Sequence, residues 1–277
     1  MPGRTRYGEA EAAAFQAGRQ LPRDGLARWR EAVARHLAPR PGMRVLDLGA
    51  GTGTWAAAFR DWFGIEVVAV EPSAAMRARS SYPVMVAGHA GAIPLADASV
   101  DGAWLSTVVH HVPDLPAAAA ELGRVLRPGA PVLVRSAFPG RHAGITLFRF
   151  FPEAVGVLDG YPSVAAVRAA FATAGFEQVA LEPVPQVSAA SLRQAAERLR
   201  RDAHTPLKLI DDAAYEAGLA RLRAAAATET GPVVDTLDLL VLRTTAWRDG
   251  YDSQPQPSPS RSRPNGSGGR TRIGPAT

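Results

Sequence analysis

The sequence predicts an α/β protein with a doubly wound, mostly parallel sheet of seven strands and a small helical and loop cap. Two observations lead to this fold class: short apolar runs rich in β-branched residues alternate with helical patterns, and several of these runs are continuously apolar. Strands of that kind are typical of parallel sheets covered by helices on both faces. The chain has 277 residues, 47% of them hydrophobic, which suffices for a core of this size.

The elements follow in βαβα order from residue 44 onward. The predicted strands are RVLDLG (44–49), EVVAVE (66–71), PVMVAG (83–88), DGAWLSTVV (101–109), PVLVRSAF (131–138), FEQVALEPV (176–184) and VVDTLDLLVLRT (233–244). Helical patterns lie near 54–62, 73–80, 115–126, 164–174, 189–202 and 212–227.

The pattern breaks at residues 139–162, which we expect to form a cap over the ligand site together with helices at about 189–227. Residues 1–249 are therefore predicted to form one domain. Residues 250–277 are rich in Pro, Ser, Gly and Arg and are predicted to be a disordered tail, because they carry too few apolar side chains to offset the entropy cost of ordering.

The composition excludes several kinds of site. The chain has no cysteine, which rules out disulfides, thiolate metal ligands and cysteine nucleophiles. It shows no signal-peptide core and no apolar run of about 18 residues, so we expect a cytoplasmic protein without a membrane partner. The tail carries four Arg against one Asp, +3 of the total charge of +5. The body keeps only +2, so no nucleic-acid partner is expected.

The strongest motif is VLDLGAGTGT at 45–54, in which an apolar strand leads into a glycine-spaced turn and then a helix. Glycine lets the chain bend tightly and lets a ligand approach the backbone without a Cβ in the way. The helix that starts there presents unsatisfied N–H groups to a ligand. Glycine spacing by itself also occurs for packing reasons, so the next strand matters.

That strand ends at Glu71, where a carboxylate can accept hydrogen bonds from ribose hydroxyls. Glu71 could instead be the acid at a helix start, because Pro72 and Ser73 follow. A dinucleotide fingerprint is disfavoured, since the third glycine comes one residue early, at Gly53. Asp47 would repel a pyrophosphate but attract a sulfonium and an amino group. This charge argument points to S-adenosylmethionine.

Further motifs strengthen this interpretation: the acid in AVEPS (69–73), the run AGAIPLADASVDGAW (90–104), the HH pair (110–111) and ELGRVLRPGAPVLV (121–134). With them, the chain resembles the class I, Rossmann-like, S-adenosylmethionine-dependent methyltransferases, and within these the small-molecule group of ubiquinone and menaquinone biosynthesis. The resemblance covers roughly residues 7–138. It implies a cofactor site made of Tyr7, Arg19, Asp47, Gly49, Ala50, Gly51, Gly53, Glu71, Pro72, Met76, His89, Ala90 and Ser106.

In that resemblance Asp47 and the glycine turn hold the methionine part, Glu71 holds the ribose, and Pro72 and Met76 flank the adenine. The backbone at 88–90 meets the adenine edge, although this chain has His89 where the family usually has Asp; a neutral imidazole can still accept a hydrogen bond. Tyr7 and Arg19 correspond to an aromatic and a basic residue on an N-terminal helix that closes over the cofactor. Arg19 is equally well explained as a solvated arginine.

Methyl transfer needs positioning and, for some acceptors, a base. Ser106, His110 and His111 follow the fourth strand, at the sheet edge where such folds bind ligands. A histidine suits proton removal, but either one could simply cap a helix or pack on the sheet. Adjacent histidines do not form a helical metal pair, so no metal is expected. Aromatic, Arg and His side chains in the cap could line a pocket or only pack the cap: His142, Phe148, Arg149, Phe150, Phe151 and Tyr161.

The sequence thus predicts a methyltransferase that acts on a small, partly apolar metabolite, with transfer to O, N or C undecided and the oligomeric state unknown. One alternative is a relative that binds the cofactor but catalyses another reaction, such as a cyclisation. A second is a non-enzymatic binding protein that recruits RNA or a partner with its basic tail. A third, an NAD-dependent oxidoreductase, is disfavoured by Asp47 and Thr54.

Overall fold

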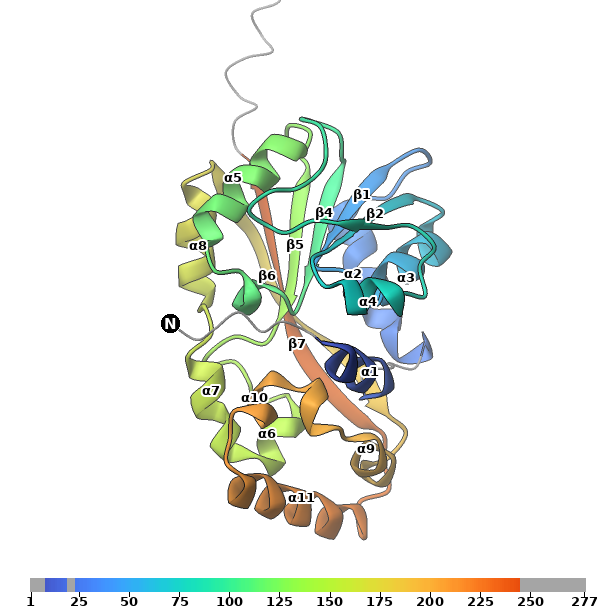
Figure 1. Cartoon of the computed structure of the whole chain (residues 1–277), viewed down its shortest axis with the longest axis vertical. Coiled ribbons are helices and arrows are strands. Elements are labelled where there is room, and N and C mark those ends of the chain that lie inside the picture. Colours follow the sequence, from blue (N-terminus) through green and yellow to red (C-terminus); the bar gives the residue numbers. More distant parts are fainter. Residues whose placement is uncertain (1–7, 19–22, 245–277) are drawn as a thin grey trace, which may run out of the picture. The chain divides into compact units, whose positions relative to one another are not determined.

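A computed structural model describes residues 8–18 and 23–244, all of which belong to the larger of two structural units, residues 1–247. The predictions for Tyr7, Arg19 and the tail at 250–277 fall outside the described residues. The predicted order of strands and helices is otherwise present throughout the sheet region (Figure 1).

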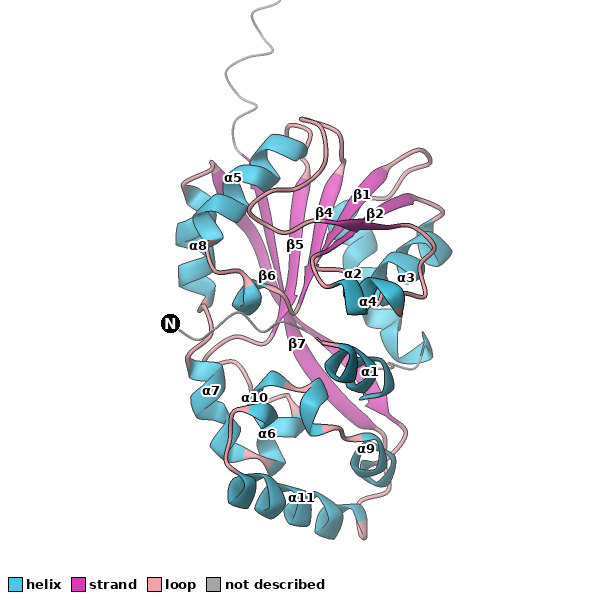
Figure 2. Cartoon of the chain, in the orientation of Figure 1, coloured by secondary structure: helices cyan, strands magenta, loops and turns pink. Residues whose placement is uncertain are grey.

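The seven-stranded sheet has the order β3-β2-β1-β4-β5-β7-β6 (Figure 2). Its strands are β1 (Arg44–Leu48), β2 (Glu66–Glu71), β3 (Met85–Ala87), β4 (Gly102–Ser106), β5 (Pro131–Ser136), β6 (Phe176–Ala189) and β7 (Val233–Thr244). All pairs are parallel except β5 with β7 and β6 with β7, so only β7 is reversed. The mostly parallel, doubly wound fold predicted from the sequence is confirmed. The order reverses between β1 and β4, where open sheets of this type bind ligands.

Helices cover both faces of the sheet because neighbouring strand residues point to opposite sides. Val45 belongs to the apolar cluster on one face and Leu46 to the cluster on the other. The first cluster includes side chains of α2 (Ala27–Leu37) and α3 (Thr54–Phe63), and the second those of α5 (Leu115–Val125) and α8 (Val164–Ala172). The helices α1 (Glu9–Gly18) and α4 (Ala74–Ala78) complete the region before β3.

Side-chain caps fix where several helices begin. Ser73 Oγ accepts from Met76 N at the start of α4, Asp114 from Ala117 N at α5, and Ser163 from Ala166 N at α8. Such a cap satisfies a backbone N–H that has no partner inside the helix.

The cap is helical and has its own apolar cluster. It comprises α6 (Thr146–Phe150), α7 (Val155–Asp159), α9 (Leu192–Arg198), α10 (Thr205–Lys208) and α11 (Asp212–Ala226), which lie together at one end of the sheet (Figure 1). Long strands β6 and β7 continue beyond their neighbours toward it (Figure 2). A three-residue 3-10 turn joins α6 to α7, and another precedes α10.

One predicted helix boundary is wrong. The helix expected over 189–202 starts only at Leu192, behind the N-cap Ser191, because Ala189 is still the last residue of β6. β6 runs well past the predicted strand, through Pro183 and Pro185. Both prolines are tolerated because β6 is the edge strand and needs ladder N–H groups on one side only.

Replacing Gly218 with Ala is expected to destabilise the cap. A Cβ at this position in α11 would collide with the ring of Phe151, which is fully buried in the cap cluster. Overpacking of this kind costs about 1–3 kcal/mol. Denaturant unfolding of Gly218→Ala should show this loss, whereas the control Gly156→Ala, in α7 with open space around its Cβ, should be neutral or slightly stabilising. Equal stability of both variants would contradict this packing.

Candidate cofactor and acceptor site

The turn after β1 has the left-handed backbone conformation that glycine favours. Gly49, Gly51 and Gly53 all have positive φ, at 73°, 56° and 76°. The Gly49 and Ala50 N–H groups donate to Val70 O on β2, at 2.8 and 3.1 Å. A Cβ on Gly49 would collide with the Val108 side chain after β4, so glycine also permits the close approach of these two loops.

Gly53 allows close packing within the protein. A Cβ there would lie 2.5 Å from Ser80 Oγ and 2.7 Å from Tyr82 Cβ, so this glycine lets the turn pack against the segment after α4. Gly53 lines neither of the two cavities described below. The structure thus gives Gly53 a packing role, and contact with the cofactor remains a prediction.

Two buried acids lie beside the glycine turn. Asp47 is 2% exposed, and its Oδ2 has no hydrogen-bond partner among the described residues. Burial, and then the negative charge of Glu71, raise the pKa of Asp47 to about 8. Glu71 is 6% exposed and accepts from Gly51 N at 2.9 Å and from Ser73 N at 2.8 Å. Burial raises the Glu71 pKa as well, and these two backbone bonds oppose the rise.

A cavity of about 740 Å³ lies against the ends of β1 and β2. Eight of the predicted cofactor residues line it: Gly49, Gly51, Glu71, Pro72, Met76, His89, Ala90 and Ser106. His111 lines it as well. The carboxylate, the apolar walls and the backbone around His89 suit a nucleoside.

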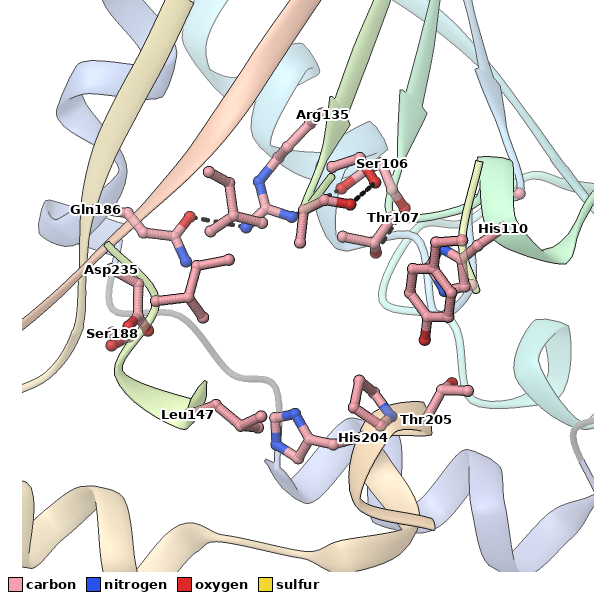
Figure 3. A pocket seen from close by; sticks show the side chains of 18 of the residues that line it. Ser106, Thr107, His110, Arg135, Leu147, Gln186, Ser188, His204, Thr205 and Asp235 are labelled. Atoms are coloured by element: carbon pink, nitrogen blue, oxygen red, sulfur yellow. Dashed lines mark hydrogen bonds between the residues drawn. The ribbon is translucent and has the colours of Figure 1, made fainter. Parts of the chain in front are cut away.

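A second cavity, of about 260 Å³, lies between the sheet and the cap (Figure 3). Asp47 and Ala50 line it, and it shares Gly49, Gly51, Ser106 and Thr107 with the larger cavity. The two cavities therefore meet at the glycine turn and at the end of β4. Thr107, at this junction, has a φ of 53°, a strained conformation for a β-branched residue.

The two histidines line different cavities. His110 lines the smaller one and stacks on the Tyr161 ring with centroids 4.1 Å apart. His111 lines the larger one. Because His110 and His111 are adjacent in the sequence, both were equal candidates for the catalytic base. In the structure, the 3-10 turn at Val109–His111 directs only His110 toward the smaller cavity.

Several lining residues of the smaller cavity were missed by sequence reasoning. They are Trp55, Arg135, Gln186, Ser188, His204 and Asp235. They come from five separate segments and carry no shared motif. Of the cap aromatics, Phe148 and Tyr161 line this cavity, while Phe150 and Phe151 are buried in the cap cluster. Arg149 pairs with Glu229, and His142 packs on Phe148.

Known proteins share this fold and site region. Residues 46–134 match a family model described as a methyltransferase domain. The demethylmenaquinone methyltransferase of Beutenbergia cavernae is 41% identical over 110 residues, 38% of this chain and 45% of that protein. The malonyl-[acyl-carrier protein] O-methyltransferase of Serratia marcescens is 36% identical over 126 residues, 44% of this chain and 48% of that protein. The chain thus spans about half the length of these curated relatives.

Solved structures agree at the level of the fold. A methyltransferase from an antibiotic biosynthesis pathway of Anabaena variabilis aligns with a TM-score of 0.63 at 21% identity, covering 83% of this chain and 99% of that one. A phosphoethanolamine N-methyltransferase of Haemonchus contortus, solved with S-adenosylhomocysteine, aligns with a TM-score of 0.57 at 19% identity, covering 87% and 58%.

The sheet order defines a Rossmann-like α/β domain with two adjoining cavities at the switch point of the sheet. The sequence matches add that residues 46–134 are similar to a methyltransferase domain, and that the chain is similar in this region to demethylmenaquinone methyltransferases. The described residues fit S-adenosylmethionine, because the buried Asp47 has one carboxylate oxygen, Oδ2, without a hydrogen-bond partner among them, which suits a cationic ligand, and Glu71 suits a ribose.

Two features are absent from the described residues, 8–18 and 23–244. None of their helices has the length and apolar character needed to cross a membrane. Within the same residues no three His, Asp or Glu side chains gather into a group that could hold a metal ion. Independence of a metal remains a prediction.

Proposed function

We propose that this chain is an enzyme that transfers the methyl group of S-adenosylmethionine to a small molecule bound in the smaller cavity. The observation that carries the proposal is the junction of the two cavities at Gly49, Gly51, Ser106 and Thr107. Residues of the larger cavity would hold the adenosine, and the residues of the junction would direct the reactive end of the cofactor toward the smaller cavity.

In this proposal each acid binds a different part of the cofactor. Asp47, at the wall of the smaller cavity, attracts the amino group and the sulfonium charge. Glu71 accepts from the ribose hydroxyls while its bonds to Gly51 N and Ser73 N hold the carboxylate in place. Pro72 and Met76 flank the adenine, and the backbone at His89 and Ala90 meets its edge.

The bound cofactor supplies an electrophilic methyl group on a positively charged sulfur. The chain orients the acceptor behind that group, and this positioning contributes most of the rate. His110, which lines the smaller cavity, would accept the proton that the acceptor atom gives up on methylation, with S-adenosylhomocysteine as the leaving group. The Tyr161 ring, stacked on the imidazole, holds His110 in one orientation.

His110→Gln is expected to lower the rate of methyl transfer about 10²- to 10⁴-fold, with S-adenosylhomocysteine affinity unchanged. His111→Gln is the matched control, because His111 lines the cofactor cavity; it should change cofactor affinity more than the rate. The measurement is release of S-adenosylhomocysteine from S-adenosylmethionine with a fractionated small-molecule extract as the source of acceptor.

Acceptor-dependent release would support the proposal. An extract component that is converted without release of S-adenosylhomocysteine would contradict it in favour of a non-methylating reaction. Full activity of His110→Gln across the pH range would remove His110 from the proton transfer.

A further inference from the structure

The floor of the smaller cavity holds a buried cation. Arg135, the penultimate residue of β5, is 6% exposed and borders the cavity. Its Nη1 donates to Ser106 Oγ at 3.2 Å and its Nη2 to Gln186 Oε1 at 2.7 Å. The guanidinium carbon also lies 5.0 and 5.2 Å from the ring centroids of Trp29 and Trp55. An arginine keeps its charge when it is buried, so this wall of the cavity is positive.

Gln186 adds a second donor beside it. Its Oε1 accepts from Trp29 Nε1 at 2.9 Å as well as from Arg135. Two donors on one oxygen fix the orientation of the amide, which leaves the Nε2 group to face the cavity (Figure 3). Arg135 and Gln186 together present N–H groups to one side of a bound molecule.

The remaining walls set the size and the rest of the chemistry. The volume of about 260 Å³ lies below the usual range of ligand pockets, about 300–1,000 Å³, and in the proposed function the methionine end of the cofactor would occupy part of it. Leu147, Phe148 and Leu158 supply apolar surface. Ser188 and Asp235 lie beside Gln186, and His204 lies on the opposite side of the cavity from Arg135 (Figure 3). The Asp235 carboxylate accepts from Thr146 N at 2.7 Å, so part of its charge is already compensated.

We propose that the methyl acceptor is a compact carboxylate, bound through its anionic group by Arg135 and Gln186 beside Ser106. The proposal rests on the proposed function, because it assigns the acceptor of that reaction. A prenylated quinone matches this cavity less well, because the polar groups of its floor would lie unpaired against an apolar molecule. Ser106, which borders both cavities, brings the anchored acceptor next to the reactive end of the cofactor.

The test is calorimetry on the full chain saturated with S-adenosylhomocysteine, using small aromatic and aliphatic carboxylates, each paired with its primary amide. We chose 4-hydroxybenzoate with 4-hydroxybenzamide as the first pair, because they match in shape and differ in charge. At least one carboxylate in the panel should bind wild type about 10- to 100-fold more tightly than its amide, as a charge-assisted contact requires.

Gln186→Glu is the decisive variant, since it keeps the acceptor for Trp29 and gives Arg135 a carboxylate within the protein. It should abolish the preference for the carboxylate and leave S-adenosylhomocysteine affinity unchanged. Arg135→Met should do the same if it folds, and the exposed α9 variant Arg193→Met should change neither quantity.

The proposal is overturned if no carboxylate is preferred over its amide, or if the preference survives in Gln186→Glu. It is also overturned if Arg135→Met or Gln186→Glu weakens S-adenosylhomocysteine binding, because the cation would then hold the cofactor's own carboxylate. Failure of wild type to bind S-adenosylhomocysteine at all would instead reject the proposed function.

Discussion

Asp47→Asn is expected to weaken S-adenosylhomocysteine binding about 10- to 100-fold and, at neutral pH, to raise the melting temperature of the cofactor-free protein. Both effects follow from one buried carboxylate whose Oδ2 has no hydrogen-bond partner among the described residues. Ionised, Asp47 attracts the ligand's ammonium group, an interaction in the range of charge-assisted hydrogen bonds. Without ligand, the same charge is unfavourable in a buried site beside Glu71.

The pH dependence has a definite sign. Burial and the Glu71 charge raise the Asp47 pKa from its usual 3.8 to about 8, so between these values the folded protein holds a proton that the unfolded chain has lost. The free energy of unfolding of the cofactor-free protein should therefore fall as the pH rises from about 4 to about 8. In Asp47→Asn this contribution disappears, which should flatten the slope, although Glu71 still contributes in the same direction.

Thermal unfolding of both proteins from about pH 4 to about pH 8.5 measures this effect, because this interval covers the range between the two pKa values. Asp159→Asn, at the exposed end of α7, is the control and should match wild type. Ligand binding favours the ionised carboxylate, so affinity should rise with pH up to about 8. A variant that is less stable than wild type and binds equally well would show that Asp47 is structural.

Glu71→Ala is expected to weaken binding of adenosyl ligands about 100-fold or more. The substitution removes the acceptor for the ribose hydroxyls and also leaves Gly51 N and Ser73 N without their acceptor. An unsatisfied buried N–H costs about 1–3 kcal/mol, so the glycine turn itself should loosen. Calorimetric titration with S-adenosylhomocysteine, at a temperature where the variant is folded, measures the loss.

Glu71→Gln separates these two contributions. It keeps one carbonyl oxygen as an acceptor but removes the charge, and its amide cannot accept at both oxygen positions. Its affinity should fall between that of wild type and Glu71→Ala. Wild-type affinity in Glu71→Ala would mean that Glu71 only starts α4 through Ser73, the alternative that the sequence left open.

The fold could be predicted from the sequence because its signals are local. Apolar runs such as EVVAVE, and the turn from Gly49 to Gly53, each specify their own backbone without reference to distant residues. The cofactor cavity follows from the same segments. The prediction ended the strand at Val184, whereas β6 continues to Ala189, and only the sheet order reveals that β6 is an edge strand, where Pro183 and Pro185 are tolerated.

The acceptor cavity could not be predicted because its residues meet only in three dimensions. Arg135 and Gln186 are 51 residues apart, and nothing in PVLVRSAF distinguishes a cavity arginine from a surface one. The choice between His110 and His111 depended on one short turn after β4. The expectation of a partly apolar pocket took account of the cap aromatics but not of the cation on the sheet.

The most direct test of the central claim is calorimetric titration of wild type with S-adenosylmethionine, S-adenosylhomocysteine and NAD, supported by thermal shifts. We predict that both adenosyl ligands bind and NAD does not, with a stabilisation of about 2.7 kcal/mol when the ligand is at about 100 times its dissociation constant. Binding of NAD without either adenosyl ligand, or binding of none of the three, would contradict the assignment of the glycine turn and Glu71 to S-adenosylmethionine.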